Sequence, residues 1–78
     1  MKRIAVVDDE PDITNVLNKG LEHQGFAADT FNNPHSALAG FQPKYYDIMI
    51  IDIRMPRING FDLYRQLKKK DTSVKSAF

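Results

Sequence analysis

Three aspartates lie where two apolar runs of the sequence end. Asp8 and Asp9 directly follow residues 4–7 (Ile-Ala-Val-Val), and Asp52 directly follows residues 48–51 (Ile-Met-Ile-Ile). A short, continuous apolar run rich in β-branched residues is typical of a strand that is buried on both faces of a parallel sheet. Ligands of open parallel sheets bind just beyond the carboxyl ends of the strands. We therefore expect a candidate site at these strand ends, centred on Asp52.

Carboxylates in such a position could bind a metal ion or attack a phosphoryl group. Three carboxylates a few ångströms apart repel one another, and either a bound proton or a hard cation relieves the repulsion. Mg²⁺ takes oxygen ligands and is commonly held by one or two carboxylates and several waters. A carboxylate beside such an ion can also attack phosphorus and form an aspartyl phosphate. Each acid taken singly has a plainer interpretation, as a helix start before Pro11 or as turn chemistry, but the joint spacing favours a shared site.

The first helix that positions these aspartates is expected between Pro11 and Gly25. Pro11 suits the first helical residue, because its missing N–H would have no partner there. Gly25 suits a left-handed end of the helix. Between them an apolar stripe at helical spacing predicts the face that packs on the sheet. The stripe consists of Ile13, Val16, Leu17 and Leu21.

Weaker signals mark the remaining elements. Residues 27–31 have the mixed polarity of a strand at the edge of a sheet. A second helix is expected to begin at residues 32–34, where two asparagines precede a proline. A third helix follows Gly60, and residues 74–78 are typical of the beginning of another strand. The expected apolar faces are Ala37, Leu38 and Phe41 in the second helix, and Phe61, Leu63, Tyr64 and Leu67 in the third.

The resulting order, β-α-β-α-β-α and the start of a strand, predicts one α/β domain over residues 1–78. Strands that alternate with helices form a parallel sheet through right-handed crossovers. If the first strand pairs with both the second and the third, the strand order is 2-1-3, with the fourth beside the third. Asp8, Asp9 and Asp52 then converge on the crevice between the first and third strands, at the point where the strand order reverses.

Composition narrows the function classes. The 78 residues carry 11 basic and 10 acidic side chains, for a net charge of +1, which gives no bulk electrostatic case for nucleic acid or membrane binding. The sequence has no cysteine, and no apolar run approaches the ~18 residues of a membrane span. We expect a soluble, cytoplasmic chain. No nucleophile–base pair and no glycine-rich phosphate loop is visible, so we expect a signalling module and not an enzyme.

Two segments resemble the receiver domain of two-component response regulators. They are residues 6–11 (Val-Val-Asp-Asp-Glu-Pro) and residues 47–60 (Asp-Ile-Met-Ile-Ile-Asp-Ile-Arg-Met-Pro-Arg-Ile-Asn-Gly), and the spacing between them fits as well. Pro56 and Gly60 match the turn that shapes the loop after the third strand in that family. The resemblance implies a flavodoxin-like fold, a sensor histidine kinase as partner, and Mg²⁺ as cofactor.

The same resemblance implies a role for each residue of the site. Asp52 is the expected phosphoacceptor. Asp9 is expected to bind Mg²⁺ directly and Asp8 through a water molecule. The main-chain carbonyl of Arg54 is expected to complete the protein's share of the metal shell, together with Asp52.

Family members of this type are longer, with five strands and five helices, and this sequence ends within the expected fourth strand. A threonine or serine after the fourth strand and a lysine after the fifth belong to the family's site, and no residue of this sequence takes those roles. Phosphotransfer is therefore expected to be impaired. The alternative is a truncated receiver that acts as an interaction or scaffold module without phosphotransfer, and a plain divalent-metal binder stays open as well.

Assembly is a further expectation from the short sequence. A sheet that ends at residues 48–51 or at residues 74–78 leaves unpaired backbone groups beside an apolar strand. One face of the sheet beside Ile13, Val16 and Leu17 would also lack a covering helix, which leaves a hydrophobic patch there. We therefore predict a homodimer whose interface uses the third strand, the 74–78 tail, or both.

Overall fold

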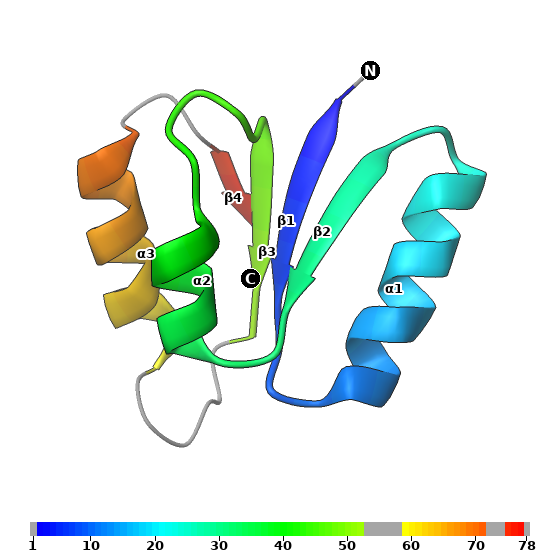
Figure 1. Cartoon of the computed structure of the whole chain (residues 1–78), viewed down its shortest axis with the longest axis horizontal. Helices are drawn as coiled ribbons and strands as arrows, with labels where there is room; N and C mark the ends of the chain where they lie inside the picture. Colours follow the sequence, from blue (N-terminus) through cyan, green and yellow to red (C-terminus); the bar gives the residue numbers. More distant parts are fainter. Residues whose placement is uncertain (1, 53–58, 72–74, 78) are drawn as a thin grey trace.

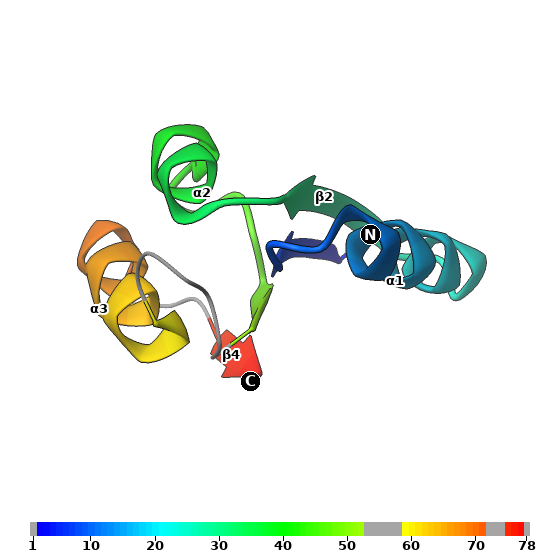
Figure 2. The same cartoon turned by 90° about the horizontal axis from the view of Figure 1, so that it is seen from below.

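Within residues 2–52, 59–71 and 75–77, which the computed structural model describes, four parallel strands form one sheet in the order β2-β1-β3-β4 (Figures 1 and 2). The predicted order 2-1-3 is confirmed, and the fourth strand lies beside the third. This is the flavodoxin-like arrangement expected from the alternation of strands and helices. The strands are β1 (Arg3–Val7), β2 (Ala27–Phe31), β3 (Ile48–Ile51) and β4 (Lys75–Ala77), and the helices are α1 (Pro11–His23), α2 (Pro34–Gly40) and α3 (Gly60–Lys70).

Helix α1 begins and ends where the sequence predicts. Pro11 occupies its first turn, and Gly25 follows its end with a φ of 89°, in the left-handed region that glycine adopts without strain. The N–H of Phe26 donates to the carbonyl of Leu21 at 3.0 Å, and the N–H of Gly25 donates to the carbonyl of Glu22 at 3.0 Å, which is the Schellman pattern. None of the helices in the described ranges has the length and hydropathy to cross a membrane.

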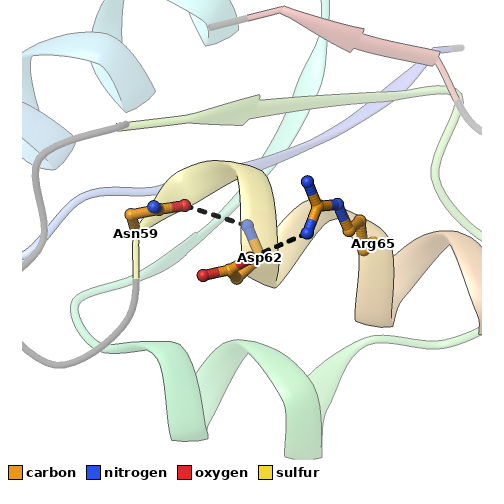
Figure 3. Close-up of polar contacts among 3 residues, drawn as sticks. All are labelled: Asn59, Asp62 and Arg65. Carbon is orange, nitrogen blue, oxygen red and sulfur yellow. Dashed lines mark hydrogen bonds and ion pairs between the residues drawn. The ribbon is translucent and has the colours of Figure 1, made fainter.

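Asparagine side chains cap the other two helices. Asn33 Oδ1 accepts the N–H of Ser36 at 2.8 Å at the start of α2. Asn59 Oδ1 accepts the N–H of Asp62 at 3.0 Å at the start of α3, as Figure 3 shows. The expected third helix begins at Gly60 itself, one residue earlier than predicted and directly after the Asn59 cap. Arg65 also pairs with Asp62 at 3.1 Å (Figure 3), but both side chains are exposed and the pair adds little stability.

The main core lies between the sheet and helices α2 and α3. Because side chains alternate between the two faces of a strand, every second residue of β1 and β3 points to this core. Met49 at 0% exposure and Ile51 at 1% are among the most buried side chains of the described residues. The cluster consists of Ala5, Val7, Ala37, Phe41, Tyr46, Met49, Ile51, Leu63 and Leu67.

The opposite face of the sheet is only partly covered. Helix α1 packs on β1 and β2, and no helix of the described ranges lies over β3 and β4 on that side (Figure 2). The prediction that residues 48–51 are buried on both faces is therefore half right, since Ile48 and Ile50 are only partly buried.

Two predicted helix faces also need correction. On α1, Leu17 is partly buried, but Ile13 is 41% exposed and Val16 is 70% exposed. The residue of α1 that is fully buried is Thr14, because the helix turns that side toward the sheet. On α3, Phe61 is 46% exposed and does not join the core.

Candidate phosphoacceptor and metal site

The parallel register of β1 and β3 places the predicted aspartates at one edge of the sheet. Val7 lies opposite Ile51, so Asp8 and Asp52 are the next residues on adjacent strands. The N–H of Asp52 donates to the carbonyl of Val7 at 2.9 Å, which continues the hydrogen bonding between β1 and β3 as far as Asp52. Both strands end at the lower edge of the sheet in Figure 1.

The three predicted carboxylates meet at this edge. One carboxylate oxygen each from Asp8, Asp9 and Asp52 lies within 4.8 Å of the others. Oxygens bound to one octahedral Mg²⁺ are roughly 3–4 Å apart, so small side-chain movements would bring these oxygens to bonding distance. An all-oxygen, anionic donor set is also the chemistry that Mg²⁺ prefers. The residues present therefore fit Mg²⁺. Arg54, whose carbonyl is a predicted ligand, and Pro56, a predicted turn residue, lie outside the described residues.

Asp8 is the most buried acid of the three. It is 9% exposed, while Asp9 and Asp52 are partly exposed. Burial raises the pKa of the Asp8 carboxyl, the neighbouring charges of Asp52 and Asp9 raise it further, and the N–H of Glu10, which donates to Asp8 Oδ1 at 3.0 Å, opposes the shift. The folded chain therefore holds this carboxylate at an energetic cost that a cation would relieve.

Replacing Asp8 by asparagine should stabilise the metal-free chain at neutral pH. Because the folded pKa is raised, the folded state binds a proton more tightly than the unfolded state. Stability is then lost as the pH rises from the ordinary value of 3.8 through the raised folded value. The asparagine keeps an oxygen for the N–H of Glu10 and removes this loss. Urea midpoints across that pH range test the prediction, and a lower midpoint for Asp8→Asn in metal-free buffer would contradict it.

Mg²⁺ binding should depend on Asp9 and Asp52. We expect weak binding in the wild-type chain, because few protein ligands leave much of the octahedral shell to water. Asp9→Asn or Asp52→Asn should weaken it further, since each removes a full negative charge, whereas Asp12→Asn on the exposed start of α1 should change it little. A Mg²⁺ titration followed by NMR gives the three affinities. Equal affinity in the wild type and Asp9→Asn would rule out the shared site.

Sequence reasoning missed two residues that contact the site. The sequence predicts a helix cap at Asn32 and Asn33 together, but the side-chain Nδ2 of Asn32 donates to the main-chain carbonyl of Asp8 at 3.0 Å and to Thr14 Oγ1 at 2.9 Å. Thr14 lies between the predicted apolar positions of the first helix and has no predicted role. The available signal was position, since Asn32 directly follows β2 at the same edge of the sheet as the aspartates.

The chain belongs to the family of response regulator receiver domains, because the model of that family matches residues 4–78. The regulatory protein VanRc of Enterococcus gallinarum is 34% identical over 68 residues, which are 87% of this chain and 29% of that protein. The transcriptional regulatory protein TrcR of Mycobacterium tuberculosis is 28% identical, over 97% of this chain and 30% of that protein. The chain thus spans about a third of the length of the curated relatives it matches.

Solved receiver structures agree with the fold. The non-phosphorylated receiver domain of HemR from Leptospira biflexa superposes with a TM-score of 0.90 at 26% identity, covering 97% of this chain and 61% of that one. The response regulator TrrA of Thermotoga maritima, in complex with Mg²⁺ and beryllofluoride, gives a TM-score of 0.84 at 39% identity, covering 97% and 66%. A structure of the histidine kinase ThkA in complex with TrrA gives a TM-score of 0.86 at 42% identity, with the same two coverages.

Proposed function

We propose that the chain accepts a phosphoryl group on Asp52 from a sensor histidine kinase in the presence of Mg²⁺. The observation that carries the proposal is the convergence of three carboxylates, within 4.8 Å, at the carboxyl edge of a receiver-type sheet. The complexes of the similar regulator TrrA with a histidine kinase and with Mg²⁺ and beryllofluoride support it.

In the proposed reaction, a carboxylate oxygen of Asp52 attacks the phosphorus of a phosphohistidine. One P–O bond forms, the P–N bond breaks, and the electron pair of that bond stays on the imidazole nitrogen of the kinase. Asp52 lies at the strand end and is partly exposed, so a partner's phosphohistidine can reach it. Its backbone N–H is held by Val7, which fixes the position of the attacking residue.

In this proposal Asp9 and Asp52 bind the metal directly, Asp8 binds it through water, and the carbonyl of Arg54 completes the protein's ligands. When bound, Mg²⁺ would neutralise the clustered carboxylates and the charge on the transferring phosphoryl group. The buried Asp8, with a pKa raised by burial, supports this assignment, because a nearby cation would lower the energetic cost of its ionised form. The proposal keeps the cytoplasmic location that we expect from the sequence.

The direct test is phosphotransfer to the 78-residue chain. An autophosphorylated histidine kinase with Mg²⁺ should add the mass of one phosphoryl group to part of the chain population, because transfer is expected to be impaired, and peptide mapping should place it on Asp52. A folded chain that binds Mg²⁺ but takes no phosphoryl group would favour the alternative, an interaction module without phosphotransfer.

Self-association is a second proposal, supported by the uncovered side of the sheet. Ile13 and Val16 are exposed on α1, and Ile48 and Ile50 of β3 are only partly buried on the face of the sheet opposite the main core. Strand β3 is paired on both sides, so within the described residues the open edge on this side of the sheet is β4. Two copies could stack these apolar faces about a two-fold axis or pair through the 74–78 tail.

The chain should accordingly be a dimer that dissociates on dilution. Light scattering over a micromolar dilution series measures this, and Val16→Lys should weaken the dimer, because it places a charge in the apolar patch. Asn15→Lys adds the same charge at the adjacent exposed position and serves as the control. A folded monomer at every concentration would contradict the proposal, and a dimer unaffected by Val16→Lys would move the interface to β4.

A further inference from the structure

The side chain of Asn32 ties three segments of the chain together beside the aspartates. Its Nδ2 donates to the main-chain carbonyl of Asp8 at 3.0 Å and to Thr14 Oγ1 at 2.9 Å. A primary amide nitrogen has two N–H donors, so both bonds form at once. A carbonyl oxygen can only accept, so the nitrogen, and not the oxygen, of the amide must face Asp8.

Thr14 gives this link a fixed end. The residue is 1% exposed, and its hydroxyl donates to the carbonyl of Pro11 at 3.0 Å, one helical turn back. The hydroxyl hydrogen is thereby committed, and the lone pairs of Oγ1 remain to accept from Asn32. A continuous series of hydrogen bonds thus connects the end of β2 with the first turn of α1.

The link fixes the peptide group that joins Asp8 to Asp9. The N–H of Asp8 donates to the carbonyl of Phe31 at 3.0 Å, and its carbonyl accepts from Asn32. Both main-chain groups of Asp8 are therefore held by consecutive residues of the β2 end. Because a peptide bond is planar, holding the carbonyl of Asp8 also sets the direction in which the chain enters Asp9.

The hydrogen bonds of Asn32 restrain the chain at the place where repulsion between carboxylates opposes formation of the site. Carboxylate oxygens of Asp8, Asp9 and Asp52 lie within 4.8 Å of one another, and their repulsion favours an outward movement of residues 8–10. We propose that Asn32 is a positioning residue, which with Thr14 holds the Asp8–Asp9 peptide so that the two carboxylates stay over Asp52 before a cation binds. This inference rests on the proposed metal and phosphoacceptor site, and it assigns no ligand role to Asn32 itself.

The test compares Mg²⁺ affinity in matched variants of the whole chain. Asn32→Ala should lower the affinity about tenfold, in the range seen when groups that orient metal ligands are removed. Asn33→Ala removes the neighbouring asparagine, which caps α2 through Ser36, and should lower the urea midpoint without changing the affinity. A merely structural role for Asn32 would give the two variants the same behaviour.

Thr14 supplies an independent second variant. Thr14→Val keeps the shape and removes the hydroxyl, so it should weaken Mg²⁺ binding in the same direction, whereas Thr14→Ser keeps the hydroxyl and should retain wild-type affinity. Unchanged affinity in both Asn32→Ala and Thr14→Val, with wild-type binding intact, would overturn the positioning role alone. Absence of Mg²⁺ binding in the wild type would instead overturn the proposed site on which the inference depends.

Discussion

Replacing Asp52 by asparagine is expected to abolish phosphoryl transfer to the chain. An amide oxygen carries no formal charge and is a far weaker nucleophile than a carboxylate, so no stable aspartyl phosphate can form. The substitution keeps the size of the side chain and leaves the backbone bond to Val7 at 2.9 Å untouched, so the fold should survive. The expected result is a loss of label to background, with an unchanged far-UV spectrum.

Asp47 provides a matched control at the other end of the same strand. It is exposed, and its Oδ2 accepts the N–H of Arg3 at 2.9 Å, a bond that an asparagine oxygen can also make. Asp47→Asn should therefore be labelled like the wild type, by kinase or by a small acyl phosphate. Beryllofluoride gives a second readout, with binding lost only in Asp52→Asn. Labelling of Asp52→Asn at the wild-type level would contradict the prediction and indicate that Asp8 or Asp9 is the phosphoacceptor.

The convergence of the aspartates was predictable because it depends on features that the sequence displays directly. Two β-branched runs define where β1 and β3 end, and the alternation with helices makes the strands parallel. Once both strands point the same way, Asp8 and Asp52 must meet at one edge, and the observed pairing of Val7 with Ile51 confirms this. Arg54 cannot be compared in this way, since it lies outside the described residues.

The role of Asn32 could not be predicted, because local sequence does not distinguish it from Asn33. Both are short amides before a proline, and both suit a helix cap. Which one caps depends on backbone direction, and which one reaches the carbonyl of Asp8 depends on how β2 lies against β1. Likewise, helical spacing predicted an apolar stripe on α1 but could not predict which side of the helix faces the sheet. In the structure Thr14 is buried and Val16 is exposed.

Truncation of Met49 should cost more stability than any surface substitution. Met49 lies in a strand that is paired on both sides, is 0% exposed, and belongs to the core between the sheet and helices α2 and α3. Met49→Ala removes buried atoms and leaves a cavity, which typically costs about 2–5 kcal/mol. A single core at this size rarely supplies more than about 3–5 kcal/mol, so much of the variant should be unfolded at room temperature.

Phe61→Ala is the comparison that makes the Met49 experiment decisive. It removes a larger side chain, but Phe61 is 46% exposed on α3, so its loss should cost no more than about 1 kcal/mol. Urea unfolding followed by circular dichroism, at one chain concentration because self-association would shift the midpoints, measures both variants. If the two midpoints fall equally, side-chain size and not burial governs the loss, and the one-sided core against α2 and α3 would not be what holds β3 in the sheet.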